Sequence, residues 1–227
     1  MSGWQMKDSD MDPKWVEEMW AKFPCVKILD ENGVPNGNYR TGPVRGSFMH
    51  VLERSPIKQM KDGSKVGGKF DGTALFPPAA DVSVLKQAAT EVALAKWPLA
   101  GQVGGPALHT PFNMQDAKAA AQPGYTPGGI YITGVADKRS PYAINPQGAP
   151  IPDNNDVYSG AWYFFIIRPF DFDAGMKKGV SFALQGVMKI ADDKKLGGGS
   201  SDPRSDFAGV SIDTSAQAAA VNPASLF

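Results

Sequence analysis

The chain has 227 residues, of which 42% are hydrophobic and 20% charged, and its formal net charge is zero. This composition is that of an ordinary globular protein and excludes disorder throughout. The single cysteine, Cys25, excludes a disulfide framework and a cysteine-based zinc module. The longest apolar run, residues 161–167, is far shorter than the roughly 20 residues of a membrane helix. We therefore expect a cytoplasmic protein that does not use a membrane as a partner.

The charges sum to zero but are unevenly distributed. Residues 1–31 carry four basic and seven acidic side chains, whereas residues 40–72 carry seven basic and three acidic ones. The basic window predicts an element that meets an anionic partner. A hairpin whose lysines only keep it soluble would have the same composition, so both interpretations stay open.

The first predicted element is a short amphipathic helix over residues 12–23. Asp12 occupies the N-cap position, Pro13 the first turn, and Trp15, Met19 and Trp20 recur at helical spacing. We expect the tryptophans to pack in the core or at a subunit contact; stacking on bases is the alternative.

A hairpin is predicted next. Residues 44–53 are typical of a strand with Val44 and Phe48 turned inward, and residues 69–76 form its partner. Between them, residues 55–68 contain the turn signal Asp62-Gly63 and several lysines. The basic cluster is therefore expected on a long hairpin tip.

The second half of the chain alternates between one helix, one long connection and three strands. Asp81 caps a predicted helix that Pro98 ends, and residues 99–128 form a connection with a short helix over 113–121. Strands are predicted over 129–137, 157–170 and 179–190. Five strands in total predict a mainly β fold, a five-stranded barrel with an inserted α-helix and an N-terminal helix.

Motifs of enzymes are absent from the sequence. There is no phosphate-binding Gly-rich loop, no Gly-x-Ser-x-Gly elbow and no His-Glu-x-x-His. The two histidines, His50 and His109, cannot complete a zinc site with one cysteine, and Asp171 and Asp173 are more typical of a turn cap than of a cation site. We expect no catalytic residues, no metal and no cofactor.

Aromatic side chains are frequent on the predicted strands and have basic neighbours. Alternation sends Trp162 and Phe164 to one face of a strand and their neighbours to the other, so one set of rings can face outward. Bases stack on such rings for about 1 to 3 kcal/mol each, and a basic groove follows the phosphates. This combination is typical of single-strand binding without sequence readout.

The order of segments resembles a known family. The segments are GPVRGSFMHVLE, GKFDGTALFPPAAD, GIYITGVADKRSPYAI, PIPDNNDVYSGAWYFFIIRPF and GVSFALQGVMKIADDKKLGG. Together they resemble the phage single-stranded DNA-binding proteins of the Enc34-like type over residues 40–198. The resemblance implies an OB-fold and a role in phage DNA replication and recombination in the host cytoplasm, with residues 1–39 as an N-terminal arm and 199–227 as a flexible tail.

The candidate site combines cations for phosphates and rings for bases. The basic candidates are Arg40, Arg45, Lys58, Lys61, Lys65, Lys69, Lys138 and Arg139, and the aromatic ones are Phe70, Tyr131, Tyr142, Tyr158 and Trp162. Similar phage proteins, including T7-like ones, end in an acidic tail with a terminal aromatic residue that recruits replication proteins. This chain keeps Phe227 but has only Asp213 as a tail acid after residue 207. Whether the protein is a monomer or a homodimer stays open.

Two rival functions remain. A phage structural or assembly protein would use the same aromatic strands for protein contacts. A small-molecule enzyme on a barrel scaffold is the weaker rival, because no set of acid, base and nucleophile emerges.

Overall fold

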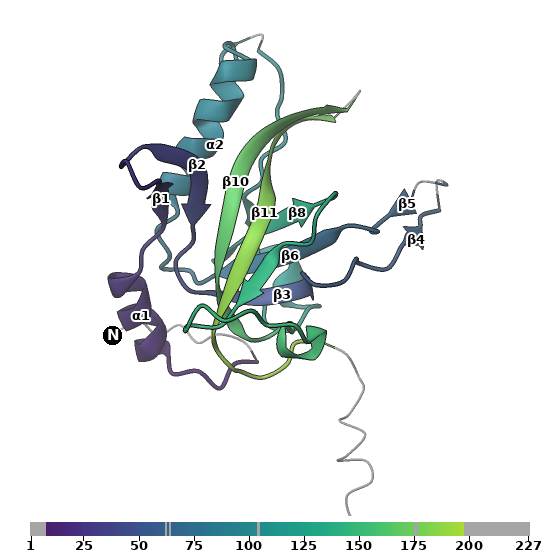
Figure 1. Ribbon diagram of the computed structural model, residues 1–227. Coiled ribbons are helices and arrows are strands. Elements are labelled where there is room, and N and C mark those ends of the chain that lie inside the picture. The colour runs from purple at the N-terminus through teal and green to yellow at the C-terminus, as the bar shows by residue number, and fades with distance from the viewer. Residues whose placement is uncertain (1–7, 62, 64, 104, 175–176, 198–227) are drawn as a thin grey trace, which may run out of the picture. The chain divides into compact units, whose positions relative to one another are not determined.

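Five strands of the computed structural model form a closed ring within a larger mixed sheet (Figure 1). The order around the ring is β10, β3, β6, β8 and β11, and β11 pairs again with β10. Neighbours in the ring are antiparallel except β8 and β11, which run parallel. The structure describes residues 8–61, 63, 65–103, 105–174 and 177–197. The ring strands are β3 (Val44–His50), β6 (Phe70–Phe76), β8 (Ile130–Ala136), β10 (Trp162–Ala174) and β11 (Lys177–Ala191).

Short strands extend this sheet at its margins. β2 pairs with β10 and carries β1 at its outer edge, whereas β9 pairs with β11 and β7 with β8. β4 and β5 form a separate two-stranded ribbon in the connection between β3 and β6. The bounds are β1 (Val26–Leu29), β2 (Pro35–Arg40), β4 (Lys58–Gln59), β5 (Lys65–Val66), β7 (Asn113–Met114), β9 (Tyr142–Ile144), the helix α3 (Asp116–Ala119) and a 3-10 turn (Asn154–Asp156).

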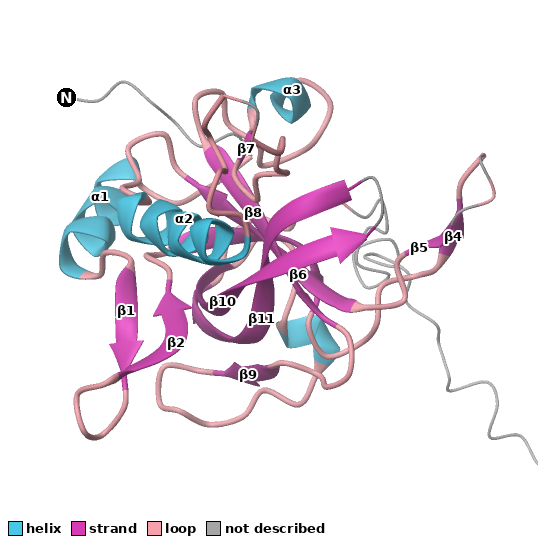
Figure 2. Cartoon of the chain, turned by 90° about the horizontal axis from the view of Figure 1, so that it is seen from above, coloured by secondary structure: helices cyan, strands magenta, loops and turns pink. Residues whose placement is uncertain are grey.

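Side chains that alternate along β10 fill the interior of the ring. Tyr163, Phe165 and Ile167 face inward and are almost fully buried, as the pleat of a strand requires. The helix α2 (Ser83–Lys96) packs against β10 and β11 and adds Leu85 to the same core. The apolar stripe of α2 therefore closes one side of the ring (Figure 2).

Bulges interrupt the ladders of the ring strands. The register between β3 and β6 shifts between Ser47 and His50, and Phe48 there has a φ of 50° and is 49% exposed. The prediction that Phe48 points into the core is therefore wrong, because the bulge turns its ring outward. In the β10–β11 ladder, Ile166 pairs with Gly186 and Ile167 with Leu184, so Gln185 is an extra residue on β11.

The helix α1 (Pro13–Lys22) covers the outer face of β10. The Asp12 side chain accepts a hydrogen bond from the Lys14 amide at 2.9 Å, as predicted for an N-cap. Val16 packs on Trp162, and Trp15 meets the same indole edge to face at 5.5 Å between ring centroids. Trp162 is consequently fully buried. The prediction that Trp162 is a base-stacking ring is corrected, because α1 already covers it.

Arg45 forms a buried clamp at the start of β3. Its guanidinium donates to the carbonyl oxygens of Gly160 (2.9 Å), Asp8 (2.6 Å) and Lys194 (2.7 Å) and lies 3.5 Å from the carboxylate of Asp193. Both side chains of this ion pair are fully buried. Arg45 was predicted to contact phosphate, and this prediction is wrong because every described contact of the side chain is internal.

Asp193 holds the N-terminal segment to the end of β11. Its carboxylate accepts hydrogen bonds from the Trp162 indole (2.9 Å), the Asp10 amide (2.8 Å) and the Lys194 amide (2.7 Å), and from the Ser9 hydroxyl. Burial alone would raise the pKa of Asp193, but these hydrogen bonds together hold it below the usual value.

This lowered pKa predicts a loss of stability in acid. A carboxyl group whose pKa is depressed by folding stabilises the protein above its unfolded pKa of about 3.9, and the contribution is lost as the pH falls through the lower folded value. Asp193→Asn is expected to be less stable at neutral pH and to lose less stability on acidification, measured by urea unfolding at pH 7 and at about pH 3. The exposed Asp137→Asn is the control, and equal acid losses in both variants and the wild type would contradict this role.

The predicted elements are confirmed in type and order. The helices predicted over 12–23 and 81–97 correspond to α1 and α2, and the five predicted strands to the ring strands. The short helix predicted over 113–121 is confined to α3. The N-cap of α2 is Val82 rather than Asp81, although the Asp81 carboxylate accepts from the Ser83 amide at 2.9 Å. The predicted boundaries at residues 39 and 198 stay predictions. No helix in the described ranges is long and apolar enough to span a membrane.

Candidate nucleic-acid interface

A groove lies where β8 and β9 separate along β11. Both strands pair with β11 in parallel, β8 at Phe182 and Ala183 and β9 from Gly186 onward. Residues 137–141 connect them and leave a hollow of about 840 Å³. We call it the cationic groove, because Lys69, Lys138 and Arg139 line it; Tyr142 and Phe170 are aromatic side chains of its lining.

Positive charge dominates this groove. Lys69, Lys138 and Arg139 are exposed, and Asp137 is the single acid among its lining residues. Asp137 is paired with Arg54 at 3.7 Å, and both side chains are largely exposed, so the pair adds little stability. Ser140 anchors the 137–141 connection through a 3.0 Å hydrogen bond to the carbonyl of Val51. Asp137 is thus paired with an arginine outside the groove lining. An anionic chain can therefore bind the groove cations without displacing Asp137 from them.

Tyr142 forms the wall at the far end of the groove. Its side chain is 49% exposed, and its ring lies directly on the backbone of Gly186. A Cβ atom at position 186 would come within 2.4 Å of that ring, so only glycine permits the contact. The Tyr142 hydroxyl is neutral at physiological pH, and partial burial raises its pKa further. A neutral, half-exposed ring beside three cations is suited to stack on a base.

A second hollow of about 500 Å³ shares Tyr142 with the cationic groove. We call it the Arg40 pocket. Phe23 and Phe164 pack edge to face with 5.4 Å between their ring centroids, and the Arg40 guanidinium lies against both rings, 5.7 and 5.1 Å from these centroids. Met188 of β11 also lines it. Two of the predicted residues, Arg40 and Tyr142, thus meet in one mostly apolar pocket.

The predicted hairpin lysines lie apart from both hollows. Lys58 and Lys65 are exposed on β4 and β5, and Lys61 is exposed in the loop between these strands. This ribbon projects away from the ring in both views (Figures 1 and 2). Only the base of the hairpin reaches the groove, through Lys69. All hairpin lysines were predicted to share one groove with the rings. Of these lysines, Lys69 alone lines the cationic groove.

Three other predicted rings already have cations against them. Arg54 lies 4.8 Å from the centroid of Phe70, and Lys118 lies 4.1 Å from that of Tyr131. Tyr158 has Lys189 at 4.8 Å, and its hydroxyl donates to the Asp192 carboxylate at 2.8 Å. Burial and this hydrogen bond raise the pKa of Tyr158 to about 12. Phe70, Tyr131 and Tyr158 are not among the lining residues of the cationic groove.

Sequence reasoning missed several residues of the two hollows. Phe164 and Phe170 lie on the outward face of β10 together with Trp162, and Phe23 follows α1. The alternation along β10 was a sufficient signal for Phe164 and Phe170. Alternation could not show which outward rings are accessible, because α1, which covers Trp162, lies far from β10 in the sequence.

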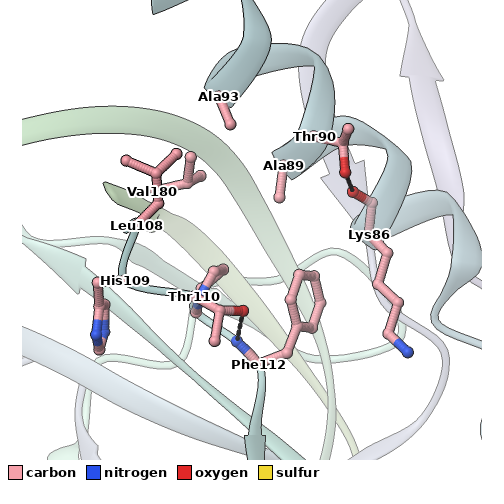
Figure 3. Close-up of a pocket in the computed structure, with 10 residues that line it drawn as sticks. Lys86, Ala89, Thr90, Ala93, Leu108, His109, Thr110, Phe112 and Val180 are labelled. Carbon is pink, nitrogen blue, oxygen red and sulfur yellow. Dashed lines mark hydrogen bonds between the residues drawn. The ribbon is translucent and has the colours of Figure 1, made fainter. Parts of the chain in front are cut away.

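A further pocket, of about 350 Å³, lies between α2 and residues 108–112 (Figure 3). Ala89, Ala93 and Phe112 give it apolar walls. Its threonines use their hydroxyls locally: Thr90 donates to the Lys86 carbonyl, and Thr110 accepts from the Phe112 amide. It shares no lining residue with the cationic groove. Among the described residues there is also no group of three or more side chains that could hold a metal ion.

Comparison with known proteins decides the family. The model of the family described as "Enterobacter phage Enc34, ssDNA-binding protein" matches residues 38–219. The chain belongs to this family. The resemblance to the Enc34 family found in the sequence is thus confirmed, and with it the expectation of a DNA-binding rather than an enzymatic family. No curated protein matches the chain.

Solved structures of the Enc34 phage protein share the fold. The single-stranded DNA-binding protein from bacteriophage Enc34 in complex with ssDNA is 22% identical, with a TM-score of 0.57 over 78% of this chain and 99% of that chain. The same phage protein in another structure is 20% identical, with a TM-score of 0.55 over 81% and 98%. The single-stranded DNA-binding protein gp2.5 of bacteriophage T7 is 12% identical, with a TM-score of 0.45 over 78% and 96%. The predicted C-terminal tail of the present Enc34-family chain, with Phe227, lies outside the described residues.

Proposed function

We propose that this Enc34-family chain binds single-stranded DNA without reading its sequence, along the cationic groove and past Tyr142. The observation that carries the proposal is the gathering of Lys69, Lys138 and Arg139 around one half-exposed ring in a protein of zero net charge. Cations attract the phosphates, and the ring offers a stacking surface worth about 1 to 3 kcal/mol per base. The role is protection of exposed strands in phage DNA replication and recombination, in the host cytoplasm.

The ring order supports an OB-fold for this function. A closed five-strand ring with one parallel pair is compatible with the five-stranded Greek-key barrel that binds oligonucleotides in many proteins. In this proposal α2 is the inserted helix and α1 the N-terminal helix that seals β10. Fold alone does not establish function, so the proposal depends on the groove.

Several predicted contacts lie outside the proposed interface. Phe70, Tyr131 and Tyr158 stay untested as stacking rings, and Lys58, Lys61 and Lys65 as phosphate contacts. Recruitment of replication proteins through Phe227, and a homodimer, likewise remain predictions. Arg45 and Trp162 are not part of the proposed interface, because both are buried.

Titration with a labelled oligo(dT) tests the proposal. A length of about 16 nucleotides covers the upper range of site sizes for one OB-fold. With three groove cations neutralising phosphates, log affinity is expected to fall with log salt at a slope of about −2 or steeper. Absence of salt-dependent binding would contradict the proposal and favour the rival role of an assembly protein, whose surfaces bind proteins.

Gly186→Ala is expected to weaken oligo(dT) binding about tenfold, within the range for one stacked base. The added methyl group displaces the Tyr142 ring from the strand on which it lies. Titration of the single variants and of the double variant provides the measurement. In a Tyr142→Ala background, Gly186→Ala is expected to have no further effect. Additive losses would show that position 186 acts other than through the ring.

A further inference from the structure

The Arg40 pocket continues the cationic groove but has a different chemical character. The pocket and the groove share Tyr142, while the pocket's other walls include Phe23, Phe164 and Met188. Its volume of about 500 Å³ lies within the range of small-ligand pockets, about 300 to 1,000 Å³. A strand that follows the groove would therefore pass the mouth of an aromatic pocket at Tyr142.

Arg40 supplies an unused hydrogen-bond donor in this apolar setting. One terminal nitrogen, Nη2, donates to the carbonyl of Pro24 at 3.3 Å. Its Nε–H is buried and has no hydrogen-bond partner among the described residues. A buried donor without an acceptor is unfavourable, and a charged donor gains more from an acceptor than a neutral one. A ligand with an accepting oxygen would satisfy this group by displacing the side chains that now cover it.

We propose that the Arg40 pocket holds one unstacked nucleobase of the bound strand, with thymine preferred over adenine. The inference rests on the proposed function, since the base reaches the pocket from a strand in the cationic groove. The base lies against Phe164 and Tyr142, and a keto oxygen accepts from Arg40. Extrusion of one base fixes the position of the strand at Tyr142 while its phosphates remain at Lys138 and Arg139.

The preference follows from the groups that each base presents. Thymine has keto oxygens as acceptors and a methyl group that suits contact with Met188 and Ile144, which also lines the pocket. Adenine has ring-nitrogen acceptors but no methyl group for the contact with Met188 and Ile144, and its exocyclic amine is a donor that cannot pair with a guanidinium. Binding of oligo(dT) is therefore expected to exceed binding of oligo(dA) by about tenfold through this pocket.

Matched arginine variants test the preference. In Arg40→Met the ratio of oligo(dT) to oligo(dA) affinity is expected to fall about tenfold, because the donor is lost while an apolar side chain still packs against the Phe23 and Phe164 rings. In Arg139→Met both affinities are expected to fall together, leaving the ratio unchanged. An unchanged ratio in Arg40→Met would overturn the proposal. Equal changes of the ratio in the two variants would attribute the thymine preference to positive charge alone. This result would also overturn the proposal.

Photo-crosslinking locates the base without any substitution in the protein. An oligo(dA) that carries one 5-iodo-deoxyuridine, placed at each position in turn, is irradiated with the full chain, and the adducts are identified by mass spectrometry. Adducts are expected on Phe164 or Met188 in addition to Tyr142, and an adduct on Tyr142 alone counts as no pocket adduct because Tyr142 also lines the cationic groove. Binding of the oligonucleotide without an adduct on Phe164 or Met188 overturns the pocket but leaves the proposed function intact. Absence of oligonucleotide binding contradicts the proposed function itself.

Discussion

Replacing Lys69, Lys138 and Arg139 together by alanine is expected to weaken oligo(dT) binding about 100-fold at about 0.1 M salt. Each phosphate contact with a single strand contributes about 0.7 to the slope of log affinity against log salt. Three lost contacts therefore flatten the slope by about 2. Over the decade from 1 M to about 0.1 M salt, a slope difference of about 2 corresponds to the expected loss of about 100-fold in affinity. Titrations at four or five salt concentrations measure both quantities in the same variant.

The β4–β5 ribbon offers a matched control for this experiment. Lys58, Lys61 and Lys65 carry the same total charge and are exposed, but they lie on a ribbon that projects away from the groove. Their triple alanine variant is expected to lose much less affinity, since charges separated by more than about 10 Å are largely screened at 0.1 M salt. Equal losses in the two triple variants would contradict a DNA path confined to the groove.

Arg45→Ala is expected to destabilise the fold by about 3 to 5 kcal/mol, because removal of one partner leaves the buried Asp193 carboxylate without its countercharge. The carbonyl oxygens of Gly160, Asp8 and Lys194 also lose their donor. For a chain of this size the melting temperature is expected to fall by roughly 10 °C. Calorimetry or circular dichroism measures the effect.

Arg139→Ala is the control for Arg45→Ala. Arg139 is exposed, and a substitution at such a surface position changes stability by about 0.5 kcal/mol or less. The two arginines thus have opposite expected signatures: Arg45→Ala lowers stability, and Arg139→Ala lowers DNA affinity. An Arg45→Ala protein that keeps its melting temperature but loses DNA affinity would restore the sequence-based view of Arg45 as a phosphate contact.

Local sequence patterns predict the two longer helices and the ring strands of this fold, but not the short strands at its margins. The apolar stripe and caps define α1 and α2, and runs of β-branched and aromatic residues define the ring strands. These signals depend on neighbours within one or two turns or along one strand, so a single sequence contains them. The Lys138-Arg139 pair followed by Tyr142 is also a local signal, and it leads to three residues of the cationic groove.

The side of a strand that each ring occupies could not be predicted with the same success. Gln185 is an extra residue on β11, so the buried positions change from Val180, Phe182 and Leu184 to Val187. This change of phase turns Gly186 and Met188 outward beneath Tyr142 and towards the Arg40 pocket. The isolated Gly186 is a local signal for a bulge or a close backbone approach, but it does not predict the change of phase.

The errors at Arg45 and Trp162 have a common physical cause. Both residues were judged from their own strands, as a cation in a basic window and as a ring on an alternating strand. Their burial depends instead on residues 8–16 and 193–194, which lie far away in sequence and cover them. Long-range covering of this kind is not encoded in the periodicity of either strand.

The position of Arg45 also constrains when the protein can fold during translation. Arg45 pairs in register with Trp162 and binds the backbone of Lys194. The contacts of β3 therefore cannot be completed until residues more than a hundred positions further along the chain have been synthesised. The ribosome must release both β10 and β11 before the ring can close. Nascent chains that end before residue 162 therefore keep β3 with one free edge, and such edges are prone to pair with other chains.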